Sequence, residues 1–181
     1  VFLMQSMACS AASLLVDSFD GPGGVLSGGT NTRLDPLDES ALFGSRWIAL
    51  RDRGRQADLV ATIGSGDAEL QMPSALPLFT SPLPSVFFLY SSQDPIALLG
   101  SQALQLDVGS IVGRGYVYVE IDTQITPDGE LNRFEITGPG LVTIPASSFS
   151  LENSNSLQRF NSLNITFEGR SPNFSLTINE L

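Results

Sequence analysis

The sequence predicts an all-β protein that folds as a single antiparallel β-sandwich of the jelly-roll type, with about ten strands and an apolar N-terminal extension. Short runs of Val, Ile, Leu and Phe recur along the 181 residues, and Gly, Pro, Asn, Asp and Ser separate them. Several runs alternate apolar with polar side chains, as a strand with one buried and one wet face requires. A chain of this length is expected to form one domain with a full hydrophobic core.

The clearest alternation lies near the end of the chain. Leu163, Ile165 and Phe167 share one face of a predicted strand, and the polar side chains between them share the other. Turn sequences at 169–173 and 126–130 are each expected to join two neighbouring strands. The expected strands are residues 46–52, 59–63, 69–72, 85–91, 103–108, 115–123, 132–137, 141–144, 162–168 and 174–179, and the expected loops are residues 21–36 and 72–85, which are rich in Gly or Pro.

The composition excludes several classes of function. The chain has no His and one Cys, which removes Ser-His-Asp and Cys-His catalysis, imidazole metal sites and thiolate zinc sites. Nine basic residues, all of them Arg, oppose nineteen Asp and Glu, so the net charge of −10 argues against nucleic acid as a partner. Each arginine of the cluster Arg46, Arg51, Arg53 and Arg55 is expected to be solvated or to pair with a carboxylate of the same chain, and the alternative is an acidic patch on a neighbouring subunit. We therefore expect a binding or structural module and no enzyme.

Residues 1–19 are predicted to form an apolar extension before a sandwich domain of residues 20–181. Residues 1–16 carry no charge, yet they are fewer than the roughly 20 residues that span a bilayer. They are either a signal-like remnant or an assembly segment, for which the residue spacing favours a helix. An ordered segment of this kind is buried by its own domain or by a neighbouring subunit. The residues expected to take part in assembly are Val1, Phe2, Leu3, Met4, Met7, Leu14, Leu15 and Val16.

Aromatic side chains are the candidates for ligand binding. Tyr116 and Tyr118 lie on the same face of a predicted strand, opposite Val117 and Val119. Aromatic rings on an exposed sheet face can stack on sugar rings, because they offer flat apolar area beside a polar edge. Tyr also favours strands and can simply cover the sheet, so both interpretations stay open. Trp47, the only Trp, is a third candidate, with packing beneath a loop as its alternative.

Two Asn-x-Ser/Thr sequences, at Asn164 and Asn173, match the pattern for N-linked glycosylation. Both asparagines are expected to face outward, on the terminal strands or in the turn between them. The pattern is common by chance, so an ordinary surface asparagine is the alternative at each position.

Residues 42–181 resemble secreted bacterial β-sandwich proteins of the cell-envelope type, associated with PEP-CTERM sorting. The resemblance rests on SRWIALR at 45–51 and on FNSLNITFEGRSPNFSLTINEL at 160–181, which has the form of a strand, a turn and a final strand. The same ending occurs in galactose-binding-like jelly rolls, including carbohydrate-binding modules. The resemblance implies a non-catalytic jelly roll located outside the cell or at its surface. In such modules the first and last strands often share a calcium ion, and the matching positions here are Asp17, Asp20 and Glu180.

Two functions from different classes follow from these features. The first is a structural subunit of an extracellular filament or surface layer, in which the N-terminal segment packs on or into a neighbouring copy of the chain. The alternative is a secreted carbohydrate-binding module that contacts an extracellular polysaccharide through Tyr116, Tyr118 and Trp47. The structural subunit is the first expectation. Neither function calls for a membrane-spanning segment or for a cofactor other than calcium.

Overall fold

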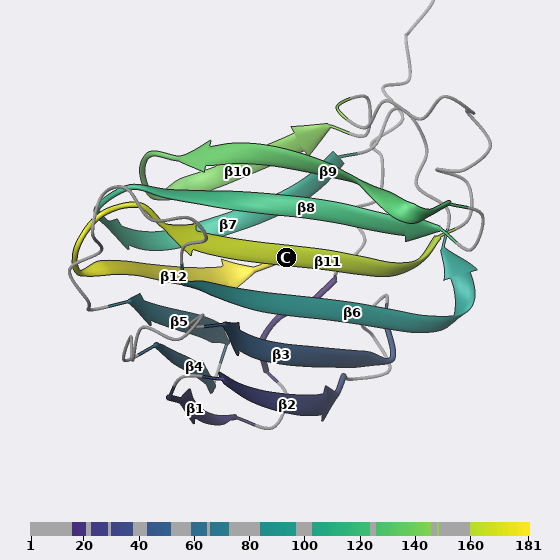
Figure 1. Ribbon diagram of the computed structural model, residues 1–181, viewed down its shortest axis with the longest axis horizontal. Coiled ribbons are helices and arrows are strands. Elements are labelled where there is room, and N and C mark those ends of the chain that lie inside the picture. The colour runs from purple at the N-terminus through teal and green to yellow at the C-terminus, as the bar shows by residue number, and fades with distance from the viewer. Residues whose placement is uncertain are drawn as a thin grey trace, which may run out of the picture.

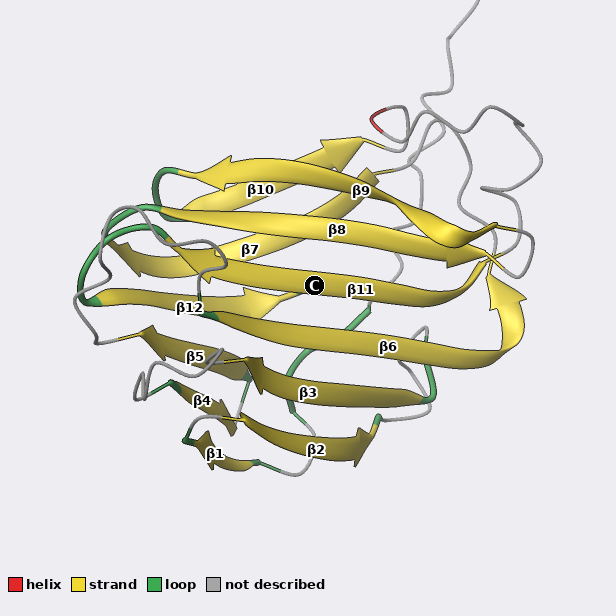
Figure 2. Ribbon diagram, viewed as in Figure 1, coloured by secondary structure: helices red, strands yellow, loops and turns green. Residues whose placement is uncertain are grey.

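The protein is an antiparallel β-sandwich with two six-stranded sheets packed face to face (Figure 1, Figure 2). This computed structural model describes residues 16–20, 23–28, 30–37, 43–51, 59–64, 66–72, 84–96, 103–123, 126–145, 148 and 160–181. Within these residues the strands, in chain order, are β1 (Gly24–Ser27), β2 (Thr30–Pro36), β3 (Ser45–Arg51), β4 (Val60–Gly64), β5 (Asp67–Met72), β6 (Ser85–Ile96), β7 (Ala103–Val112), β8 (Gly115–Thr123), β9 (Thr126–Ile136), β10 (Gly140–Pro145), β11 (Phe160–Gly169) and β12 (Phe174–Glu180).

The sheet nearer the viewer in Figure 1, called the front sheet, has the order β2-β3-β6-β11-β8-β9. The back sheet behind it has the order β1-β4-β5-β12-β7-β10. The last two strands of the chain occupy central positions: β11 pairs with β6 and β8, and β12 pairs with β5 and β7. Because strands far apart in sequence pair in this way, the topology is that of a jelly roll.

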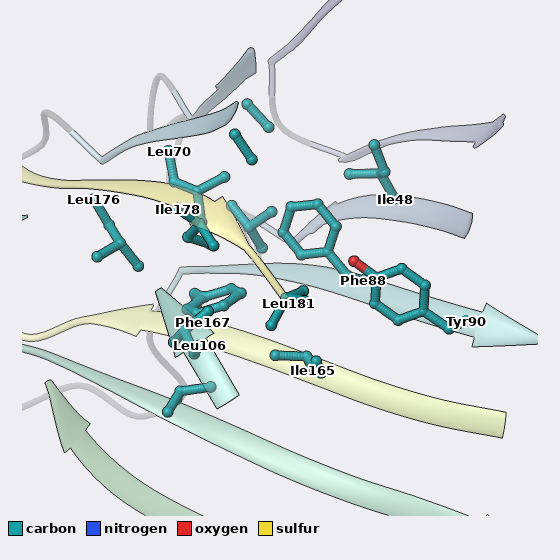
Figure 3. Close-up of a cluster of buried hydrophobic side chains, with 14 of the residues drawn as sticks. Ile48, Leu70, Phe88, Tyr90, Leu106, Ile165, Phe167, Leu176, Ile178 and Leu181 are labelled. Carbon is teal, nitrogen blue, oxygen red and sulfur yellow. The ribbon is translucent and has the colours of Figure 1, made fainter. Parts of the chain in front are cut away.

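The core lies between the two sheets and follows from the alternation of side chains along each strand. Figure 3 shows Ile165 and Phe167 of β11 and Leu176 and Ile178 of β12 within one cluster of buried hydrophobic side chains. All four side chains are fully buried. Phe88 of β6 packs edge-on against Phe167, with ring centroids 5.8 Å apart. Apolar residues at alternate positions of both inner faces therefore form one continuous core, as a sandwich requires.

All ten expected strands are present, with shifts of a few residues at their ends, and the structure adds β1 and β2. Residues 21–36 were expected to be a loop because of their glycines. The prediction was wrong because glycine is compatible with the strands here: Gly23 permits close approach to the backbone of β4, and Gly24 leaves room for a side chain of β2. A Cβ atom at Gly23 would stand 2.8 Å from the carbonyl oxygen of Ile63, and one at Gly24 would collide with the guanidinium group of Arg33.

Of the two expected turns, the structure confirms one and corrects the other. Residues 170–173 join β11 to β12, and Asn173 adopts the left-handed conformation (φ 56°) that suits Asn in a turn. Residues 126–130 are instead the first part of β9, which pairs with β8 as expected but from Thr126 onward. The ladder shifts register between Ile121 and Thr123, and this irregularity accommodates the Pro-Asp-Gly sequence within the strand. The proline-rich residues 73–83 lie outside the described residues.

The sandwich begins before residue 20. Val16 and Phe19 belong to the core, and the backbone amides of Val16 and Asp17 donate hydrogen bonds to the carbonyl oxygen of Leu181. Residues 16–19, which the sequence assigns to the extension, therefore pack with the sandwich. Residues 1–15, including the expected helix, lie outside the described residues. In the described part of the chain, no helix has the length and apolar character needed to cross a membrane.

Candidate functional site

Four aromatic side chains lie on the outer face of the front sheet: Trp47 of β3, Phe87 of β6, and Tyr116 and Tyr118 of β8. We call this surface the aromatic face. The residues that follow them in each strand point into the core, so strand alternation directs these rings outward. Each of the four is half-buried, so each combines a fixed position with accessible area.

The strand register places the four rings across the middle of the sheet. Phe87 and Tyr118 both stand opposite Thr166 of β11, one from each side. Tyr116 follows on the same face, with its ring centroid 6.4 Å from that of Tyr118. Trp47 lies on β3, three strand positions from β8, a span of about 14 Å across the sheet.

Polar side chains between the rings are connected to one another. Arg170 forms an ion pair with Glu168, with 2.6 Å between Nε and Oε1. The hydroxyl group of Tyr118 accepts a hydrogen bond from Arg170 Nη2 at 3.3 Å and donates one to Glu168 Oε1 at 3.4 Å. Further along β11, the side-chain amide of Asn164 donates to Glu120 Oε2 at 3.0 Å. These contacts hold the Tyr118 hydroxyl group and two carboxylates in fixed orientations.

Three arginine side chains lie over rings of the aromatic face. The Cζ atom of Arg51 is 3.8 Å from the ring centroid of Phe87. Arg133 and Arg170 lie over Tyr116, at 4.8 and 5.2 Å from its centroid. Among the described residues, no guanidinium group lies over Trp47 or Tyr118. Among the described residues these two rings therefore carry no stacked guanidinium group, and we call them the open rings.

Comparisons with known proteins give likenesses of fold. The family 11 carbohydrate-binding module of the cellulosomal cellulase Lic26A-Cel5E of Clostridium thermocellum is 14% identical, with 91% of this chain and 90% of that chain covered and a TM-score of 0.47. A carbohydrate-binding module specific for non-crystalline cellulose, CBM28, is 13% identical over 70% of this chain and 82% of its own, with a TM-score of 0.39. The solution structure of CtCBM11 is 15% identical over 97% and 99%, with a TM-score of 0.39. No family model and no curated protein matches the chain.

A separate cluster of charged side chains is buried inside the sandwich. Arg46 of β3 is fully buried and donates to Asp17 Oδ2 at 2.6 Å and to Asp35 Oδ2 at 3.2 Å. The Tyr90 hydroxyl group donates to the same oxygen of Asp17 at 3.0 Å. Arg33 binds both oxygens of Asp35, at 2.6 and 2.7 Å. The prediction that Arg46 pairs with carboxylates is thus confirmed, and the cluster ties the segment before β1 to β2, β3 and β6.

The buried cluster predicts a defined dependence of stability on pH. Burial by itself would raise the pKa of Asp35, but hydrogen bonds from Arg33 and Arg46 outweigh it and lower the pKa below the usual 3.8. Burial, followed by the charge of Asp17, raises the pKa of Tyr90 well above the usual 10.0. The lowered pKa of Asp35 therefore stabilises the fold fully above pH 3.8, and this stabilisation is lost as the pH falls below that value. The raised pKa of Tyr90 stabilises the fold fully below pH 10.0, and this stabilisation is lost as the pH rises beyond that value.

Urea unfolding followed across this range is expected to show a plateau of unfolding free energy with a decline at each end. Tyr90→Phe is expected to make the alkaline decline shallower, because the buried hydroxyl group that resists ionisation is gone. Tyr118→Phe, which removes a hydroxyl group from the outer face, is the matched control. An alkaline decline of equal slope in the wild type and Tyr90→Phe would show that Tyr90 is not its source.

The three residues expected to bind calcium are not gathered into a site. Both carboxylate oxygens of Asp17 already accept hydrogen bonds, from Phe19 N, Arg46 and Tyr90. Asp20 and Glu180 are exposed, and no group of three or more Cys, Asp or Glu among the described residues is arranged to hold a metal ion. The backbone of Asp17 is bonded to Leu181 after the last strand, and its carboxylate binds the guanidinium group of Arg46 on β3.

The other predicted site residues are divided between the core, the surface and the part of the chain not described. Val16, expected in assembly, is a core residue, and the remaining assembly residues lie outside the described residues, so the filament stays a prediction. Asn164 lies within β11 with its amide nitrogen bonded to Glu120, whereas Asn173 is exposed in the turn after β11. Only Asn173 therefore presents a side chain open to a modifying enzyme.

Proposed function

We propose that the protein is a non-catalytic carbohydrate-binding module and that the aromatic face is its binding surface. The observation that carries the proposal is the pair of open rings, Trp47 and Tyr118, which lie on the outer face of the sheet about 14 Å apart across the strands and two residues apart along them. Rings of this kind bind sugars because the C–H faces of a pyranose are apolar while its edges carry hydroxyl groups. A polysaccharide chain lying across the strands would contact both rings.

The remainder of the aromatic face supplies what the sugar hydroxyl groups need. Thr166 lies between Phe87 and Tyr118, and the carboxylates of Glu120 and Glu168 lie on the same surface. Tyr and Trp lose little conformational entropy on binding, because each has only two side-chain torsions and the sheet already restricts them. A ligand of this class is found outside the cell, which agrees with the location expected from the sequence.

Affinity electrophoresis in gels that contain soluble polysaccharides tests the proposal. Tyr118→Ala and Trp47→Ala are each expected to weaken binding about tenfold, because each removes a central aromatic contact. Leu141→Ala is the matched control, since Leu141 is 58% exposed on the back sheet and far from the aromatic face. Its retardation is expected to equal that of the wild type.

Two results would contradict the proposal. One is the absence of retardation by every neutral and acidic polysaccharide in the gels. The other is retardation that Tyr118→Ala and Trp47→Ala leave unchanged while thermal unfolding shows that both variants are folded.

A further inference from the structure

The guanidinium groups on the aromatic face differ in how their hydrogen-bond donors are used. An arginine carries five N–H donors and pairs readily with carboxylates. Arg170 uses its donors on Glu168 and Tyr118. Arg51 and Arg133 are exposed, and in the described part of the chain neither has an ion pair or a hydrogen bond from its side chain. Their only described side-chain contacts are with the rings of Phe87 and Tyr116.

Unpaired arginines are unexpected in this protein, because carboxylates outnumber basic residues by nineteen to nine. Glu135 stands two residues from Arg133 on the same face of β9 and forms no ion pair with it. On this face Glu168 is engaged by Arg170, and Glu120 by Asn164. Stacking on an aromatic ring orients a guanidinium group while leaving its N–H edges free. Phe87 and Tyr116 thus hold two charged groups ready for a partner from outside the chain.

The positions of these arginines match the proposed path of the ligand. Arg51 lies on β3 and Arg133 on β9, four strand positions apart, or about 19 Å. The open ring of Tyr118 is directly opposite Arg133 in the β8–β9 ladder. The ring of Trp47 is on the same strand and face as Arg51. Arg133 therefore stands at the β9 edge of the face, and the guanidinium group of Arg51 lies over Phe87, whose strand is between those of Trp47 and Tyr118.

We propose that the ligand is an acidic polysaccharide and that Arg51 and Arg133 bind its anionic groups at two points, whereas the net charge of −10 disfavours a polyanion over the rest of the surface. This inference rests on the proposed function and specifies its ligand class. The anionic group is a carboxylate or a sulfate carried by a sugar ring. Both are oxyanions that a guanidinium group binds through two N–H groups. Trp47 and Tyr118 contact the sugar rings, and the arginines select for the charge.

The experiment compares three polymers in affinity electrophoresis: polygalacturonate for carboxylates, dextran sulfate for sulfates, and hydroxyethylcellulose as the neutral polymer. Binding to an acidic polymer is expected to exceed binding to hydroxyethylcellulose and to weaken as salt is added. Arg51→Gln and Arg133→Gln are each expected to weaken it about tenfold. Arg114→Gln is the matched control, because Arg114 is exposed in the turn between β7 and β8 and its loss changes the net charge equally.

The outcomes separate this inference from the function on which it rests. Retardation by polygalacturonate or by dextran sulfate that falls in Arg51→Gln and Arg133→Gln, and not in Arg114→Gln, supports the inference and identifies the anionic group. Retardation by hydroxyethylcellulose alone overturns the inference and leaves carbohydrate binding in place. Acidic-polymer binding that all three arginine variants share with the wild type overturns it too. If no polymer retards the protein, both the inference about the ligand and the proposed carbohydrate-binding function are wrong.

Discussion

Replacing Arg46 by Met is expected to lower the free energy of unfolding by about 3–5 kcal/mol, the usual cost of removing one partner from a buried ion pair. The reason is the position of Asp17, which is 2% exposed and would lose its guanidinium partner at 2.6 Å. Asp35 would lose one of its two arginines and keep Arg33. Urea unfolding of the wild type and variant at neutral pH measures the difference.

Two further variants test whether Asp17 is the cause of that loss of stability. Arg46→Met combined with Asp17→Asn is expected to recover part of the loss, because the unpaired charge is gone and the Asn side-chain oxygen can still accept from Phe19 N. Asp20→Asn, at an exposed carboxylate three residues away, is expected to change stability by less than about 0.5 kcal/mol. A loss below about 1 kcal/mol in Arg46→Met would show that the buried charges are compensated by other groups.

Phe174→Ala is expected to cost about 3–5 kcal/mol, the range found for buried Phe. Phe174 begins β12 in the back sheet, and its side chain is buried against Gly115 of β8 and Gly169 of β11 in the front sheet. The ring thus fills the end of the sandwich where the β7–β8 and β11–β12 turns meet. Removing it leaves a cavity that two backbones without side chains cannot fill. Thermal unfolding measures the loss.

A double-mutant cycle with Gly115→Ala tests whether the ring is what makes the glycine necessary. A Cβ atom at Gly115 would collide with the Phe174 ring, so Gly115→Ala is expected to cost about 1–3 kcal/mol in the wild type. In the Phe174→Ala background the collision partner is gone, and the same substitution is expected to cost clearly less. Equal costs in both backgrounds would show that the close contact is not with the ring.

Strand alternation accounts for most of what could be predicted from the sequence. It located the ten expected strands and placed Tyr116, Tyr118 and Trp47 on outward faces. It also contained a signal that was not used: Arg46 has the parity of Ile48 and Leu50, the inner face of β3, so its burial was available from the pattern. Phe87 was missed in the same way, between the inward Val86 and Phe88.

What could not be predicted depends on strand order and register. Trp47 on β3 and Tyr118 on β8 share a face only through the pairing of β3, β6, β11 and β8. Asp17 reaches Arg46 from a segment whose backbone is bonded to Leu181, a contact that local sequence does not reveal. Glycine was the other source of error. Glycine is typical of loops, but here it also permits the close approach of β1 to β4. Only the packing of the folded protein distinguishes a loop glycine from a glycine at such a close approach.

The central positions of β11 and β12 determine the order in which this protein can fold as it is synthesised. Until residues 160–181 have left the ribosome, β6 and β8 have no partner between them in the front sheet, and β5 and β7 have none in the back sheet. Four strands then present open edges, which are the surfaces through which incomplete sheets aggregate. Folding of both sheets therefore waits for β11 and β12 to be synthesised.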